Sequence, residues 1–187
     1  QKALAEQSGN RFLLGIGVSH KPFVEGVRGL TYRPPVATMR DYLKKMAVAP
    51  YQSVEPSEEP PTVIAALGPK MLELARDQCT GAHPYFVSPE HTSFARNILG
   101  PDKWLCVEQK VILEPDAATA RDLARPVAQI YAGLPNYRNN WLRMGLSERG
   151  LENGGSDKFI DATFAWGTVD QIRARINEHF DAGADHV

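Results

Sequence analysis

The sequence contains few cysteines and no long run of charged or apolar residues. Its two cysteines, Cys79 and Cys106, form no C-x-x-C pair, and free cysteine is usually buried and inert, so we expect both to be structural. The formal net charge is −1, without a basic run or an acidic tail, which gives no reason to expect nucleic acid or a membrane surface as a partner. No apolar stretch approaches the ~20 residues of a membrane-spanning helix. The start, QKALAEQSGN, lacks the features of a signal peptide, so the two thiols favour a reducing cytoplasm.

The composition is that of an ordinary globular protein. Hydrophobic residues make up 43% and charged residues 23% of the 187 positions, which is enough for one domain with a sizeable core. No shift in composition marks a second domain, so we expect a single domain over residues 1–187. Within it, residues 134–158 form a polar stretch that we interpret as an insertion or a lid.

Strand-like and helix-like segments alternate along the chain. Apolar strands are expected at 11–18, 62–67, 82–87 and 105–113, and ADHV at the C-terminus begins one more. Helices are expected at the very start, at 38–47, after Pro69, after Ser88-Pro89, after Pro115-Asp116, near 158–165 and at 168–180. This alternation predicts an α/β fold, in which a parallel sheet is connected by right-handed crossovers.

The turn in AALGPKM, after the second expected strand, is a candidate phosphate site. Gly68 separates a buried strand from a helix whose free N–H groups and positive dipole end suit an anion, and Lys70 would add a point charge. The same residues also suit an ordinary strand–helix turn, with glycine for its backbone angles and Pro69 at the first helical position. The turn is not a Walker loop, because a second glycine and a G-K-[ST] sequence are missing.

The stretch RFLLGIGVSHKP, residues 11–22, ends a strand with two glycines and then presents polar side chains. Gly15 and Gly17 would let the backbone approach a flat ring, with Ser19 and His20 beyond it, and a β-bulge that closes the strand explains the pattern equally well. GIGVSH also lacks the third glycine of a dinucleotide fingerprint. His20 and His83 stand near strand ends, where functional residues gather in parallel α/β folds, although a single histidine is more often structural.

The remaining histidines and aromatic residues allow several interpretations. His91 is expected at a helix start, His179 on an outer helix face and His186 in the last strand. Tyr85 and Phe86 would either line an apolar pocket or pack against the next helix. The string NYRNNW, residues 136–141, is expected to be a substrate lid or a subunit contact.

Three segments together resemble a known family. RFLLGIGVSH, VIAALGPKMLELARDQCTGAHPYFVSPEHT and FAWGTVDQIRARINEHFDAGADHV are similar to the luciferase-like monooxygenase and flavin-dependent oxidoreductase superfamily. Within it, the chain resembles most the actinobacterial branch that uses the 8-hydroxy-5-deazaflavin coenzyme F420 in place of FMN. The resemblance implies a TIM (β/α)8 barrel with a long insertion, usually dimeric. It makes RFLLGIGVSH the fourth strand, CVEQKVIL the seventh and ADHV the start of the eighth. Because a complete barrel takes ~250 residues, this chain would be an incomplete one, the C-terminal portion of such a barrel.

The resemblance also implies where a coenzyme would bind. Its phosphate would lie at the turn Leu67-Gly68-Pro69-Lys70, and the catalytic residue close to the reactive ring would be His20. Tyr85 falls at a coenzyme contact after the sixth strand. The residues expected to bind the coenzyme are Gly17, Ser19, Leu67, Gly68, Pro69, Lys70, His83 and Tyr85, and no metal ligand is expected.

The implied function is hydride transfer between the reduced coenzyme and a small organic substrate, with His20 as proton donor or acceptor. FMN would need a phosphate at the same turn, so an FMN-dependent luciferase-like monooxygenase is one alternative. A metal-dependent TIM-barrel hydrolase that uses His20, His83 and His186 is a second, and a non-catalytic barrel that binds a ligand or a partner is a third. A homodimer is expected, with the helices at 38–47 and 69–78 partly buried by the second subunit.

Overall fold

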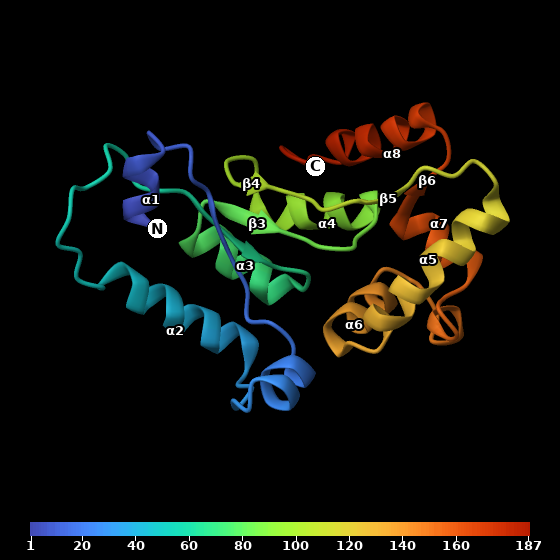
Figure 1. Ribbon diagram of the computed structural model, residues 1–187, viewed down its shortest axis with the longest axis horizontal. Coiled ribbons are helices and arrows are strands. Elements are labelled where there is room, and N and C mark those ends of the chain that lie inside the picture. The colour runs from blue at the N-terminus through green and yellow to red at the C-terminus, as the bar shows by residue number, and fades with distance from the viewer.

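The computed structural model describes all 187 residues and contains a parallel four-stranded sheet (Figure 1). Its strands are β1 (Leu14–Ile16), β2 (Thr62–Ala65), β3 (Gly81–His83) and β4 (Trp104–Leu105), in the order β1-β2-β3-β4 with every neighbouring pair parallel. Beyond β4, Cys106 forms a parallel bridge with His186. The C-terminal residues therefore take the next place in the sheet, as the barrel order predicts.

Helices connect the strands and cover the sheet. They are α1 (Lys2–Gln7), a π-helix at Pro22–Val27, α2 (Pro35–Ala47), α3 (Pro69–Gln78) and α4 (Pro89–Leu99). Both α3 and α4 begin with proline directly after their N-cap residues, Gly68 and Ser88, where the missing N–H group has no cost. As expected, the turns after β2 and β3 start helices, whereas the π-helix after β1 was not expected from the sequence. Helix α3 packs between α2 and α4.

The main core lies between the sheet and helices α3 and α4. Ile64, Leu72, Ala82 and Leu105 are completely buried there, and truncation of such a leucine typically costs ~2–5 kcal/mol. The close approach of β3 and β4 requires a glycine, because a Cβ atom on Gly81 would lie 2.0 Å from the carbonyl oxygen of Trp104. The register of these two strands thus depends on one residue without a side chain.

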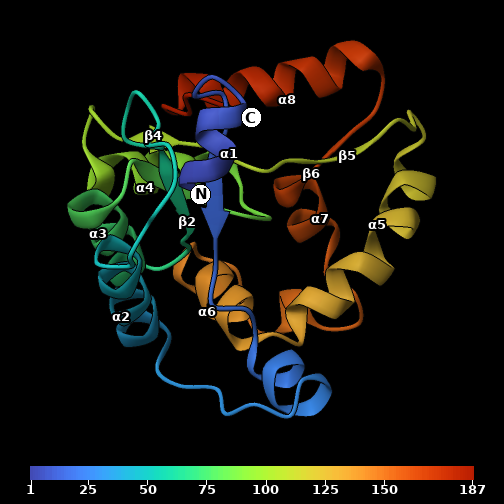
Figure 2. The same cartoon turned by 60° about the vertical axis from the view of Figure 1, so that its left-hand side comes forward.

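A second region contains β5 (Lys110–Ile112), α5 (Ala117–Ala132), α6 (Pro135–Arg143), a 3-10 turn (Arg149–Leu151), α7 (Asp157–Thr163), β6 (Phe164–Trp166) and α8 (Val169–Asp181). Figure 1 shows α5 and α7 on the right, away from α1 and α2 on the left, and in Figure 2 α6 lies between α2 and α5. Its core is aromatic: the ring of the fully buried Phe86 lies 5.0–5.2 Å from those of Tyr131, Trp141 and Phe164. Helix α5 turns a row of alanines toward this core: Ala120, Ala124, Ala128 and Ala132.

The prediction of one strand over 105–113 is wrong. The chain leaves the main sheet after Cys106, and β5 pairs instead with β6 in a separate two-stranded parallel sheet. The break has a polar cause, because Glu108 accepts a hydrogen bond from the backbone N–H of Phe86 and Gln109 donates one to the carbonyl of Thr163. These two side chains are held inward and end the strand.

One other expectation about the same region needs correction. The helix expected near 158–165 ends at Thr163, and the next three residues form β6. The polar stretch 134–158 contains a regular helix, α6, whose Tyr137, Asn140 and Trp141 are buried. The aromatic residues of NYRNNW therefore pack inside this chain.

Candidate functional site

A cavity of about 710 Å³ opens at the carboxyl ends of β1, β2 and β3. All nine residues expected from the sequence line it: Gly17, Ser19, His20, Leu67, Gly68, Pro69, Lys70, His83 and Tyr85. The sequence prediction that the Gly68 turn and the Ser19–His20 segment lie at the same rim is therefore confirmed. Ligand pockets usually have volumes of ~300–1,000 Å³, so the cavity is large enough for a coenzyme-sized molecule.

One end of the cavity is formed by His20. Its imidazole lies 5.6 Å from the ring of Tyr137 and 6.1 Å from that of Phe23. Burial lowers the pKa of His20, and a contact with the Asn136 side chain opposes this only in part. The imidazole is therefore neutral at pH 7, with one nitrogen that can accept a proton. The preceding Ser19 adopts a left-handed backbone with φ of 59°, and its carbonyl accepts a hydrogen bond from the Tyr32 hydroxyl at 3.3 Å.

The two glycines before His20 have different surroundings. Gly17 lines the cavity, and a Cβ atom on it would lie 3.1 Å from the Cβ atom of Ala65. Gly15 does not line the cavity, and a Cβ atom on it would meet nothing within 4 Å. Close packing against β2 thus accounts for the glycine at position 17, and the same lack of a side chain leaves the cavity wall open there.

The other end of the cavity is the N-terminus of α3. Gly68 is the N-cap residue, and its carbonyl accepts hydrogen bonds from the N–H groups of Met71 and Leu72. Lys70 stands in the first turn, and the guanidinium of Arg143 reaches the same turn from α6, with Nη2 3.8 Å from the position of a Cβ atom on Gly68. Neither Lys70 nor Arg143 forms an ion pair. Two free cations and a helix N-terminus make this end suitable for an anion.

His83 and Tyr85 form the wall between the two ends, and both are held by hydrogen bonds. Because a carbonyl only accepts, the 2.7 Å contact of His83 Nδ1 with the Cys106 carbonyl places a proton on Nδ1 and leaves Nε2 as the free nitrogen. The Tyr85 hydroxyl lies 2.8 Å from Lys110 Nζ and 3.0 Å from the Tyr131 hydroxyl. The Lys110 ammonium is also 4.0 Å from the centre of the Tyr85 ring, a cation–π contact. Tyr85 is thus fixed on two sides.

The charges around the cavity all have one sign. Three cationic side chains line it, Arg28, Lys70 and Arg143, and no carboxylate does. Sequence reasoning found Lys70 but missed the two arginines, together with Tyr32 and the residues of α6 that face the cavity. A signal was present in the sequence, since Asn136, Asn139 and Arg143 are spaced i, i+3 and i+7 and share one face of a helix. The polar composition of NYRNNW concealed this helix.

The remaining histidines lie outside the cavity. His91 is completely buried at the first turn of α4. The prediction that His179 lies on an outer helix face is wrong: its side chain is 0% exposed, with Nδ1 2.8 Å from the Thr92 hydroxyl and Nε2 2.8 Å from the Gln109 side-chain oxygen. No three side chains among the His, Cys, Asp and Glu residues form a group that could hold a metal ion, so His20, His83 and His186 are not brought together.

The remaining expectations concern the two cysteines and the length of the helices. Cys79 and Cys106 are free and buried, and burial raises the pKa of both thiols, so they are present as unreactive thiols at neutral pH. None of the helices is long and apolar enough to span a membrane.

The fold and the site define the class of this protein: part of an α/β barrel with a cavity at the carboxyl ends of its strands that is lined by cations and by no carboxylate. The sequence model of the luciferase-like monooxygenase family matches residues 3–186. The chain belongs to this family.

Relatives with known structures or curated descriptions support the fold. A putative coenzyme F420-dependent oxidoreductase of Mycobacterium tuberculosis is 25% identical over 168 residues, which cover 67% of this chain and 48% of the relative. The chain thus spans about half the length of that curated relative. The coenzyme F420-dependent tetrahydromethanopterin reductase of Methanopyrus kandleri superposes with a TM-score of 0.69 at 17% identity, over 100% of this chain and 70% of the reductase.

A structural neighbour that holds FMN is also found. The oxygenating constituent of 3,6-diketocamphane monooxygenase from Pseudomonas putida, in complex with FMN, superposes with a TM-score of 0.57 at 13% identity, over 96% of this chain and 64% of that protein. An F420-dependent secondary alcohol dehydrogenase, in complex with an F420–acetone adduct, superposes with a TM-score of 0.69 at 14% identity, over 98% and 64% of the two chains. Together these likenesses establish the partial TIM-barrel fold expected from the sequence.

Proposed function

We propose that this chain forms the coenzyme-binding part of an F420-dependent oxidoreductase, which transfers a hydride between the coenzyme and a small organic substrate. The observation that carries the proposal is the polarity of the cavity, with free cations and a helix N-terminus at one end and a neutral histidine among aromatic rings at the other. A phosphorylated flavin or deazaflavin has the matching arrangement, with an anionic phosphate at one end and an aromatic ring system at the other. The residues present therefore fit such a coenzyme, which supplies the hydride chemistry when bound.

The residues of the chain would have distinct roles. Gly68, Lys70 and the start of α3 would hold the phosphate, and Tyr85 would border the middle of the ligand. His20 would accept a proton from a substrate hydroxyl during oxidation and return it to the carbonyl oxygen during reduction, because its neutral imidazole has a free lone pair. The adjacent rings of Tyr137 and Phe23 would keep water away from this transfer.

The test separates binding from proton transfer, and it uses the full-length protein. Gly68→Asp places a carboxylate where an anion must sit, so F420 should bind ~10²-fold more weakly or worse. His20→Ala should leave the affinity nearly unchanged and slow single-turnover hydride transfer by ~10²–10⁴-fold. Because burial lowers the pKa of His20, the parent rate should have a titration below pH 6.5 that His20→Ala lacks.

The control is His186→Ala, since that side chain lies outside the cavity. If Gly68→Asp binds F420 like the parent and His20→Ala loses binding, the two ends have been assigned the wrong way round. If neither variant has an effect, the site is elsewhere. Parallel titrations with FMN test the alternative of an FMN-dependent monooxygenase, which the FMN-bound neighbour supports. Tight binding without any turnover would favour a non-catalytic barrel.

Three further expectations belong to this proposal. Residues 1–187 would form a single domain, with 134–158 as an insertion or lid beside the cavity. The full-length protein would be a homodimer, because Tyr42 of α2 is 55% exposed and Val48, which directly follows α2, is 81% exposed. The buried free thiols fit a reducing cytoplasm.

A further inference from the structure

We infer that Arg143 is a second ligand for the phosphate at the Gly68 turn, and that Asn140 and His91 are the positioning residues that hold it there. The inference rests on the proposed function for the identity of the coenzyme. It adds a residue from α6, an element far from the turn in sequence, and a buried polar chain behind it. It also makes recognition of the phosphate depend on the insertion 134–158.

The position of Arg143 is the first observation. It is the last residue of α6, it lines the large cavity, and its two Nη atoms lie 3.8 and 4.0 Å from the position of a Cβ atom on Gly68. Nη1 donates a hydrogen bond to Asn140 Oδ1 at 3.0 Å, and no carboxylate neutralises the charge. A guanidinium has five N–H donors in a fixed plane, so most of them remain available to an anion beside Gly68.

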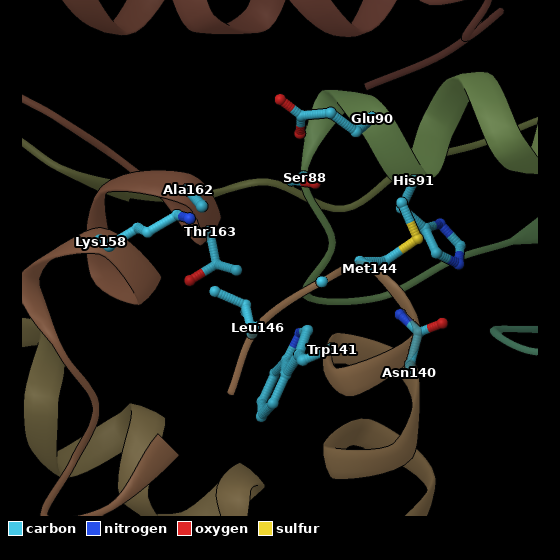
Figure 3. A pocket seen from close by; sticks show the side chains of 11 residues that line it. Ser88, Glu90, His91, Asn140, Trp141, Met144, Leu146, Lys158, Ala162 and Thr163 are labelled. Atoms are coloured by element: carbon cyan, nitrogen blue, oxygen red, sulfur yellow. The ribbon is translucent and has the colours of Figure 1, made fainter. Parts of the chain in front are cut away.

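Asn140 is the second observation. Its side chain is 1% exposed, and because a guanidinium only donates, the atom that faces Arg143 must be the amide oxygen. The amide nitrogen then points the other way, toward a smaller cavity of about 190 Å³ that is also lined by Met144 and Thr163 (Figure 3). That nitrogen has no hydrogen-bond partner. A buried amide kept at this cost, with its oxygen on Arg143, fits a residue retained to orient the arginine.

His91 completes the chain of contacts. It is 0% exposed, and its Nε2–H donates to the carbonyl of Leu67, the residue before Gly68, at 2.9 Å. Burial lowers the pKa of His91, the positive charge of Arg143 lowers it further, and the Asn140 side chain lies close enough to oppose this in part. The imidazole is therefore neutral and adds no second charge beside Arg143. His91 thus fixes the carbonyl that precedes Gly68, Asn140 fixes the guanidinium that lies against Gly68, and both side chains border the same small cavity (Figure 3).

The arrangement fits a phosphate ester better than a single carboxylate. Lys70 provides a point charge and the free backbone N–H of the first turn, Arg143 provides a planar fork of donors, and the start of α3 adds the positive end of its dipole. Donors from three directions match the tetrahedral oxygens of a phosphate, whereas the two oxygens of a carboxylate lie in one plane. Arg143 should therefore contribute to the affinity for phosphorylated ligands only.

The experiment compares ligands that differ by the phosphate alone, in the full-length protein. Arg143→Gln should weaken FMN and F420 by ~10–100-fold, since one charged hydrogen-bonding group is lost, and should leave riboflavin and the phosphate-free deazaflavin unchanged. The matched control is Arg138→Gln, on the same helix but paired with Glu148 and outside the cavity. Asn140→Leu should show part of the Arg143→Gln effect and Asn140→Gln less of it, because glutamine keeps an amide oxygen for the guanidinium without adding a charge.

Two nuclear magnetic resonance measurements separate this inference from the proposed function. Inorganic phosphate should shift the amide signals of Gly68 and Lys70 in the parent and shift them less in Arg143→Gln. The pKa of His91 should rise in Arg143→Gln because a nearby cation is removed. If phosphate shifts these signals but neither coenzyme binds, the proposed function fails and the inference stands. If Arg143→Gln weakens riboflavin and FMN equally, or leaves FMN and phosphate binding unchanged, the inference is wrong.

Discussion

Lowering the pH from 7 to 5 is expected to destabilise the fold through one completely buried side chain, His179. Its Nε2–H donates to Gln109 Oε1, and its Nδ1 accepts from the Thr92 hydroxyl, each at 2.8 Å. The orientation of Gln109 is fixed, because its amide nitrogen donates to the carbonyls of Lys110 and Thr163. Burial, aided by the nearby charge of Arg175, lowers the pKa of His179 to about 4.

The magnitude follows from the difference between the folded and unfolded pKa values. An unfolded histidine titrates near 6.5 and the folded one near 4, and each unit of difference corresponds to ~1.4 kcal/mol. Above pH 6.5 the side chain is neutral in both states, and its contribution to stability is fully present. As the pH falls from 6.5 to 4, only the unfolded state binds the proton, so the free energy of unfolding decreases by ~2 kcal/mol at pH 5 and by ~3 kcal/mol below pH 4. The total free energy of unfolding of a domain of this size is ~5–15 kcal/mol.

Urea denaturation at several pH values between 4.5 and 8 tests this prediction, with His179→Gln as the comparison. Glutamine stays neutral, so the variant should start less stable at pH 8 and lose less stability than the parent between pH 6.5 and 5. His91, whose pKa is also lowered by burial, contributes in the same direction and is equally present in both proteins. Parallel losses in parent and variant would refute the reasoning, as would a His179 imidazole signal that titrates near pH 6.5 in the folded protein.

Two other predictions concern packing and assembly. Gly81→Ala should destabilise the protein by ~3 kcal/mol or more, because the new methyl group would lie 2.0 Å from the Trp104 carbonyl oxygen. In the control Gly15→Ala the methyl group meets nothing within 4 Å, so the melting temperature should change little. Similar melting temperatures for the two variants would contradict the proposed cause. Light scattering of the full-length protein at micromolar concentration should give the mass of a dimer. Because Tyr42 of α2 is exposed, Tyr42→Glu should shift the measured mass toward that of the monomer. A monomeric parent would remove the dimer from the proposal.

Much of the cavity could be predicted from the sequence because parallel strands place their carboxyl ends at one edge. Once β1, β2 and β3 were recognised as parallel, His20, Gly68 and His83 had to lie at the same rim, without knowledge of a single contact. The places of these strands in a barrel came from the resemblance to the luciferase-like family, not from the apolar segments themselves.

What the sequence did not reveal depends on contacts between distant residues. From the sequence alone, His179 is expected on an exposed face of its helix. Its burial depends on contacts with Thr92 and Gln109, which lie 87 and 70 residues away in the chain. The strand break after Cys106 is likewise set by the backbone of Phe86, to which Glu108 binds. Local periodicity contains no information about such partners, so these features require coordinates.

Helix α6 makes the protein sensitive to insertions and deletions at a place where its polar sequence suggests tolerance. Its cavity face carries Asn136, Asn139 and Arg143, whereas the buried Trp141 faces the aromatic core and does not line the cavity. One added or removed residue would turn everything beyond it by ~100°, so that a charged arginine would face the aromatic core and a tryptophan the ligand. Residues 51–61 contain no helix or strand, so length changes among relatives should fall there and stay out of 135–143. A library of single-residue insertions would reveal the same division.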